Sequence, residues 1–314
     1  MRFALPVVLK RGDELKHLLK KVPLFVIILT MAVLSVIHCF AATEYLVNGY
    51  SYNVLTNSSI ALCGWDNSAP ELIVPESIAG RHVTAIADDA FRSNTEITTV
   101  NFSEATALTT IGFDAFNGCT SLQGELDIPE SIALIKMRAF MDCSSLQSAV
   151  IKAKISKISE QAFYNCGSLS SVSLPDTVTV IDNYAFANCP NLTYVEIPAS
   201  VEVIYRSAFV NDSNVTFGVY FNSYAHQFAK DNNIPYKLLD EFKLGDVNMD
   251  GYVNINDVTS IQRNLAELEQ FNELQELTAD ANCDKEIDIS DATAIQMFSA
   301  EYVLPYPIGE IITA

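Results

Sequence analysis

Oxygen-bearing side chains crowd one short segment near the C-terminal end, G-D-V-N-M-D-G-Y-V-N-I-N-D at residues 245–257. They stand at positions 1, 3, 5, 9 and 12 of a twelve-residue loop, as Asp246, Asn248, Asp250, Asn254 and Asp257. Gly251 at position 6 allows a sharp turn, and Tyr252 at position 7 offers its backbone carbonyl oxygen. Because Ca²⁺ takes about six to eight oxygen ligands and a loop with this spacing wraps the ion, the segment predicts a calcium site.

The same pattern returns in D-A-N-C-D-K-E-I-D-I-S-D at residues 280–291. Its candidate ligands are Asp280, Asn282, Asp284, Glu286 at position 7, Asp288 and Asp291. Lys285 replaces glycine at position 6, so this residue must take a strained turn and adds positive charge near the ion. Each loop is followed by a segment with Ile-Gln on a predicted helix, a repetition that a merely solvated acidic tail does not explain. We therefore expect two calcium ions, and a module that folds when they bind, because its crowded carboxylates need a counter-charge.

A second periodicity occupies the middle of the chain. The dipeptide Ala-Phe recurs every 23 to 25 residues, at Phe91, Phe116, Phe140, Phe163, Phe186 and Phe209. In the unit from Ile181 to Ile204, an Ala-Phe segment with helical spacing precedes a short alternating strand that stops at Pro198. Since one such unit cannot bury its apolar side alone, the period predicts a stacked solenoid.

Four cysteines follow the same period, Cys119, Cys143, Cys166 and Cys189. We interpret them as a column of small buried residues, because disulfides between stacked units would leave equivalent thiols in a row. Their spacing does not suit a zinc site, which needs clustered ligands. Cys63 and Cys283 stand outside this column.

The N-terminal segment has the layout of an export signal. Basic residues precede an apolar run and two alanines, so we expect residues 1–41 to be a signal peptide cut after Ala41 or Ala42. The alternative is an uncleaved anchor formed by Val22–Phe40. With 19 basic and 38 acidic residues, the chain should repel nucleic acid and, after cleavage of the signal, anionic membranes.

The repeats hold no obvious catalytic set. Beyond the signal the histidines are His82 and His226, neither of which accompanies a nucleophile pattern. The repeats fill nearly all of the chain before residue 240, so no catalytic domain has room and we expect no enzyme activity. The outward strand positions are small, polar and mildly acidic. They predict either a plain solvated face or a protein or glycan contact centred on Tyr194.

The recurring I-x-x-x-A-F-x-x-C-x-x-L-x-x-V-x-I-P pattern resembles the BspA-like leucine-rich repeat family over about residues 45–238. The resemblance implies an α/β solenoid of short strands and short helical turns. Its members are mostly surface or secreted proteins linked to adhesion and protein recognition.

The paired loop-helix units, about residues 243–303, resemble a type I dockerin, with Asp rather than Glu at position 12. The resemblance implies a small all-α calcium-binding module that binds a cohesin domain of a scaffoldin. Cohesin contacts would come from loop positions 10 and 11 and from the helix that follows. Carried over, these are Ile255, Asn256, Gln262 and Arg263 in the first half and Ile289, Ser290, Gln296 and Met297 in the second. Arg263 in the first half corresponds to Met297 in the second half. This difference puts in doubt whether both halves bind the same cohesin.

We therefore expect a signal peptide (1–41), a repeat solenoid (42–239), a dockerin (240–304) and a tail (305–314), which either packs on the module or is disordered. The predicted protein is a secreted, non-catalytic component of a cellulosome-type assembly for polysaccharide catabolism. Its solenoid would bind an unknown protein or glycan ligand. The alternatives are a membrane-anchored or cell-surface adhesin and an accessory polysaccharide-degrading enzyme.

Overall fold

The computed structural model describes residues 45–66 and 69–313, so the expected signal segment lies outside the described residues. The chain divides into two compact units, the first ending at Val215 and the second covering Thr216–Ala314. The first unit carries the repeats and the second carries both acidic loops. Each unit is described separately below.

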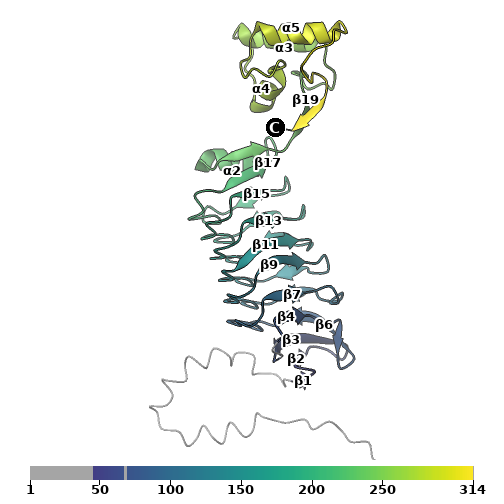
Figure 1. Cartoon of the computed structure of the whole chain (residues 1–314), viewed down its shortest axis with the longest axis vertical. Coiled ribbons are helices and arrows are strands. Elements are labelled where there is room, and N and C mark those ends of the chain that lie inside the picture. The colour runs from purple at the N-terminus through teal and green to yellow at the C-terminus, as the bar shows by residue number, and fades with distance from the viewer. Residues whose placement is uncertain (1–44, 67–68, 314) are drawn as a thin grey trace, which may run out of the picture. The chain divides into compact units, whose positions relative to one another are not determined.

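The first unit opens with an antiparallel meander of β1 (Tyr45–Val47), β2 (Tyr50–Val54) and β3 (Ser59–Trp65). Strand β6 (Arg81–Ile86) joins β3 in parallel, and β8 (Thr110–Ile111) and β10 (Leu134–Ile135) continue this sheet (Figure 1). The short β5 (Ser77–Ile78) pairs antiparallel with β6, and β4 (Glu71–Ile73) pairs in parallel with β7 (Thr99–Asn101).

Parallel ladders run along the repeats. One contains β9 (Gly124–Ile128), β11 (Leu146–Ile151), β13 (Ser171–Ser173) and β15 (Tyr194–Glu196). The other contains β12 (Lys157–Ile158), β14 (Val180–Ile181) and β16 (Val203–Ile204). In the first ladder Leu126, Ala149, Val172 and Val195 are in register and buried, so each repeat covers the apolar face of the next.

The Ala-Phe segments stack as the period predicts. The rings of consecutive repeats are parallel, with centroids 5.3 Å apart for Phe116 and Phe140 and 5.4 Å apart for Phe140 and Phe163. The stack continues from Phe91 to Phe209. Five offset aromatic pairs thus form the spine of the core, and each adds to the burial of its rings.

The predicted helical turns are hydrogen-bonded turns that do not extend into an α-helix in the described part of the first unit. A residue with positive φ precedes the Ala-Phe pair in five repeats and another follows two residues after each Phe, for example Gln161 (56°) and Asn165 (59°). The N–H groups here bond to the neighbouring repeat, as from Phe163 to the carbonyl of Ala185 at 2.8 Å. Because these donors point along the stack, they are not free to form a helical ladder.

The second unit begins with β17 (Thr216–Val219), α2 (Tyr224–Asn232) and β18 (Tyr236–Leu238), where β18 pairs in parallel with β17. We call residues 216–238 the cap segment. After it come β19 (Glu241–Lys243), α3 (Ile255–Leu265), α4 (Glu273–Ala279), α5 (Ile289–Ser299) and β20 (Ile311–Thr313).

The C-terminal tail packs on the helices, which decides between the two alternatives left by the sequence. Ile308 lies in the buried core with Val258, Ile261 and Ile295, and β20 pairs antiparallel with β19. A Cβ at Gly309 would meet the Phe298 ring at 2.7 Å, so the backbone approaches α5 closely here. The three-helix module is therefore closed by a two-stranded sheet that the sequence does not predict.

Candidate calcium-binding loops and partner surface

The first acidic loop is organised by its own side chains. Both carboxylate oxygens of Asp246 accept backbone N–H bonds, from Asp250 at 3.1 Å and from Gly251 at 2.8 Å. The side chain of Asn248 accepts the N–H of Asp250 at 2.9 Å, and Asp250 accepts that of Tyr252 at 2.9 Å. These bonds curl the loop so that its polar side chains turn inward, as a cation-binding loop requires.

Asp257 joins the two ends of this loop. Its oxygens accept the N–H of Asn248 at 3.0 Å and of Asn254 at 2.8 Å. Asn254 is the N-cap of α3 and Asp257 is its third residue, so a reciprocal capping box begins the helix. The side chain of Asp257 is fully buried. Position 12 of the loop is thus both a candidate ligand and the start of the following helix.

The second loop repeats the backbone N–H bonds of the first. Asp280 accepts the N–H groups of positions 5 and 6, and Asp291 accepts those of positions 3 and 9 while it caps α5 with Asp288. Lys285 has φ of 74° where Gly251 has 89°, so the strained turn expected at this non-glycine residue is a left-handed one. The second loop therefore has the same backbone conformation as the first at a higher conformational cost.

Burial makes the carboxylates of position 12 difficult to ionise. Burial raises the pKa of Asp257, and the charge of Asp246 adds to the effect. Burial likewise raises the pKa of Asp291, with contributions from Asp280 and Asp284. A bound cation would reverse both effects, because an opposite charge favours the ionised form.

The donor set fits calcium in type and register. Each loop supplies carboxylate, amide and backbone carbonyl oxygens, the hard ligands that Ca²⁺ prefers. In residues 45–66 and 69–313 no group of three or more His, Cys, Asp or Glu side chains is gathered as for a metal ion. Each loop thus has the donor types and the spacing of a calcium-binding loop.

All eight candidate partner-binding residues lie at the surface. Ile255, Asn256, Gln262 and Arg263 are exposed on α3, and Ile289, Ser290, Gln296 and Met297 are exposed on α5. The two halves differ in chemistry. Arg263 pairs with Glu269 at 3.3 Å, whereas the corresponding Met297 adds to an apolar surface with Phe298.

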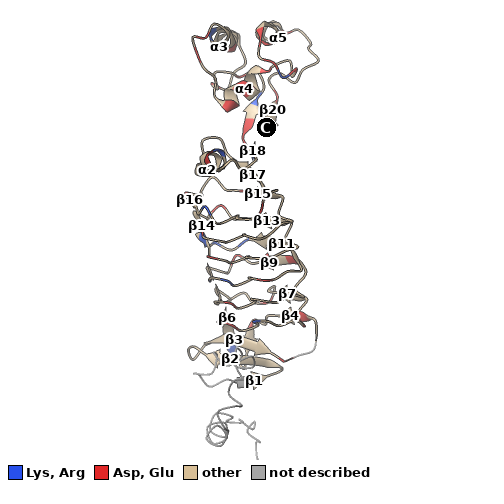
Figure 2. Cartoon of the chain, turned by 90° about the vertical axis from the view of Figure 1, so that its left-hand side faces the viewer, with Lys and Arg blue, Asp and Glu red and all other residues tan. Residues whose placement is uncertain are grey.

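The repeat unit offers a polar outward face and an inert interior. Positions such as Glu125, Ser171 and Tyr194 are exposed, and in the view of Figure 2 Lys and Arg form no continuous band on the described chain. The four thiols of the cysteine column are buried, and each donates to the carbonyl of a Phe in the preceding repeat, for example Cys166 to Phe140 at 3.2 Å. Burial raises their pKa values, which suppresses reactive thiolate.

Comparisons with known proteins agree with both units. A family model for the BspA type leucine rich repeat region matches residues 84–216 in six copies, and one for the dockerin type I domain matches residues 244–298. No curated protein matches the sequence.

The chain is similar to solved leucine-rich repeat structures. The leucine rich repeat protein of T. pallidum has a TM-score of 0.51 and 26% identity, over 56% of this chain and 81% of that protein. A leucine rich cell surface protein from Faecalibacterium prausnitzii has a TM-score of 0.43 and 24% identity, over 58% of this chain and 55% of that one. A leucine-rich repeat protein from Bacteroides ovatus has a TM-score of 0.43 and 20% identity, over 56% of this chain and 53% of that one. The chain thus spans about half the length of the last two.

The chain consists of a BspA-type leucine-rich repeat region followed by a C-terminal type I dockerin domain. The predicted fold, a leucine-rich repeat solenoid followed by a small helical calcium-loop module, is confirmed, and the structure shows that the solenoid is built of parallel strands and turns. A dockerin implies a cohesin partner, and type I dockerins typically bind calcium. The two matched families are non-catalytic. In the described part of the chain, no helix is long and apolar enough to cross a membrane.

Proposed function

We propose that this protein is a secreted, non-catalytic component of a cellulosome-type assembly. Its dockerin binds a cohesin of a scaffoldin, and its repeat solenoid displays a surface for a protein or glycan. The proposal depends above all on the two loops, whose hydrogen bonds agree position by position. We place the solenoid at residues 42–239 and the dockerin at 240–304, with residues 1–41 as a cleaved signal.

In this proposal two calcium ions complete the dockerin. The first would be held by Asp246, Asn248, Asp250, Asn254 and Asp257 with the carbonyl of Tyr252. The second would be held by Asp280, Asn282, Asp284, Asp288 and Asp291 with the carbonyl of Glu286. When bound, the ions neutralise the crowded carboxylates, so their binding energy becomes stability of the helices.

Cohesin binding by the full chain tests the proposal. Binding to a panel of cohesins would be measured by calorimetry with calcium and then with a chelator, beside the variant Asp257→Asn and the exposed control Asp231→Asn. We expect binding that chelation abolishes, that Asp257→Asn weakens and that Asp231→Asn preserves. A calcium-loaded protein that binds no cohesin would instead make the module a calcium-stabilised terminal domain.

The ligand-binding role of the solenoid needs its own test. Tyr194 is exposed on the outward face of β15 and its hydroxyl lies 3.3 Å from Glu196, so an aromatic ring and a carboxylate are offered together. A glycan array and a cell-binding assay would compare the native chain with Tyr194→Ala. Unchanged binding would favour a merely solvated face, and hydrolysis of any glycan would contradict the non-catalytic assignment. N-terminal sequencing of exported protein would distinguish a cleaved signal from the anchor alternative.

A further inference from the structure

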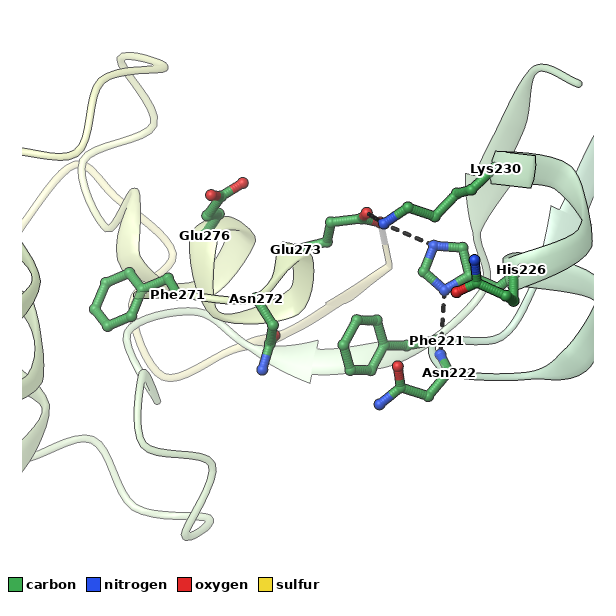
Figure 3. A pocket seen from close by; sticks show the side chains of 9 residues that line it. Phe221, Asn222, His226, Lys230, Phe271, Asn272, Glu273 and Glu276 are labelled. Atoms are coloured by element: carbon green, nitrogen blue, oxygen red, sulfur yellow. Dashed lines mark hydrogen bonds and ion pairs between the residues drawn. The ribbon is translucent and has the colours of Figure 1, made fainter. Parts of the chain in front are cut away.

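A buried histidine in the cap segment has a defined hydrogen-bonding state. His226 on α2 is 3% exposed, and its Nδ1 accepts the backbone N–H of Asn222 at 3.2 Å. In the neutral ring the proton must therefore be on Nε2. That nitrogen lies 2.9 Å from Oε2 of Glu273 on α4, and the N–H donates to it (Figure 3).

Glu273 collects two further donors from the same segment. The hydroxyl of Tyr236 on β18 donates to Oε2 at 3.0 Å, and the ammonium of Lys230 on α2 pairs with Oε1. One dockerin carboxylate thus receives donors from three cap residues. We call Glu273, His226, Lys230 and Tyr236 the Glu273 latch.

The helix that carries Glu273 is tied to both acidic loops. Gln275 donates its side-chain N–H to the carbonyl of Val247 at 3.3 Å, and the N–H of Gly245 donates to the carbonyl of Thr278 at 2.9 Å. At its other end α4 is capped by Asp280, the first residue of the second loop. Any change that loosens the loops therefore loosens the position of Glu273.

The latch borders solvent and can open. A pocket of about 340 Å³ lies beside it, lined among others by Phe221, Phe271 and Glu276. Lys230 and Glu273 keep side-chain exposures of 45% and 30%, whereas His226 keeps 4%. If the Glu273 side chain moves away from the cap segment, Lys230 is rehydrated at little cost. The Nε2–H of His226, however, loses its hydrogen-bond partner in a buried site.

We propose that the Glu273 latch couples the folding of the dockerin to the cap segment that follows the last repeat, so that α2 and β18 are better protected while the dockerin is folded. The calcium dependence of this coupling rests on the proposed function, because calcium is what folds the module. The dockerin is then an intramolecular support for the segment before it as well as a docking module.

Hydrogen–deuterium exchange of the full chain tests the coupling. Peptides from residues 224–238 report the cap segment, those from the two acidic loops report the dockerin, and those near Phe140 serve as an internal reference. The variant Glu273→Gln removes the latch charge. The matched control Glu276→Gln removes the same charge from α4 at an exposed residue that no described cap residue bonds.

We expect Glu273→Gln in calcium to speed exchange of residues 224–238 by roughly tenfold or more, since charged hydrogen bonds are lost. Glu276→Gln should leave it unchanged. Chelation of the native chain should speed exchange in both loops and in residues 224–238. In the Glu273→Gln variant, chelation should speed exchange in the two loops but add little to the exchange already seen in residues 224–238.

Equal exchange in Glu273→Gln and Glu276→Gln would overturn the latch, as would a cap segment that stays protected while chelation opens the loops. If chelation leaves the loops protected, the proposed calcium binding fails, and the comparison of the two variants in one buffer still decides the latch. If Glu273→Gln folds poorly, the latch variant Lys230→Met and its exposed control Lys237→Met replace the first pair. Exchange of residues 224–238 is then compared between these two cap-segment variants.

Discussion

The carboxyl of Asp212 should make the stability of the repeat solenoid depend on pH. Asp212 stands three residues after Phe209, where each of the four preceding repeats has a cysteine. It is 5% exposed, and its Oδ1 accepts the N–H of Cys189 at 2.6 Å. Its Oδ2 is buried without a hydrogen-bond partner among the described residues. Burial outweighs the single N–H bond and raises the pKa of this carboxyl to about 7.

The direction of the effect follows from proton binding. The folded protein holds the proton to about pH 7, whereas an unfolded aspartic acid loses it near 3.8. Between these values the folded state binds more protons, so the free energy of unfolding falls as the pH rises from about 4 to 7 and is level above. A difference of about three pH units corresponds to at most about 4 kcal/mol.

Asp212→Asn removes the ionisation and keeps an oxygen for the Cys189 N–H. We expect the variant to be more stable than the native chain at pH 8 and nearly equal to it at pH 4.5. Urea unfolding would be followed through Trp65, the only tryptophan, which lies in the repeat unit on β3. The exposed control Asp176→Asn should leave the pH dependence unchanged. A native chain and an Asp212→Asn variant with parallel pH profiles would refute the reasoning.

Three further outcomes follow from the structure. Phe163→Ala removes the ring between two stacked neighbours and should lower the free energy of unfolding by about 3–5 kcal/mol, measured by the same urea titration; a loss below about 1 kcal/mol would mean that the stack contributes little. Lys285→Gly should raise calcium affinity in the second loop, because glycine takes the left-handed turn freely and a repelling charge is removed; unchanged affinity in calorimetry would contradict this. A thiol reagent should modify the exposed Cys283 in the native chain and spare the buried Cys166 until urea is added, as peptide mass mapping would show; early modification of Cys166 would contradict the buried column.

The repeat could be predicted from the sequence because each unit must satisfy the same stacking contacts. The Ala-Phe period places the rings of Phe116 and Phe140 in register, and the structure confirms a continuous stack. The conformation of the connecting turns could not be predicted. Helical spacing in one unit does not reveal that its N–H groups bond to the next unit, since those bonds depend on residues 22 to 24 positions away in the sequence.

The acidic loops were predictable for a different reason. A twelve-residue loop with candidate oxygen ligands at positions 1, 3, 5, 7, 9 and 12 is a local pattern, and the bonds of Asp246 and Asp257 stay within it. The left-handed turn at Lys285 follows from the same local register. The signal that marks Asp212 was also in the sequence, because the residue interrupts the cysteine column, but its burial and orphaned oxygen are visible only in the folded chain.

The sequence by itself was enough to predict the two architectures, the spacing of the candidate ligands in both loops and the exposed residues of α3 and α5. These depend on short-range spacing and on periodicity. Only the tertiary structure decided that Ile308 of the tail enters the dockerin core, and that Glu273 receives donors from His226, Lys230 and Tyr236. The three contacts of Glu273 join single residues 37 to 47 positions apart. They leave no period in the sequence, because each occurs once and is set by how whole elements pack.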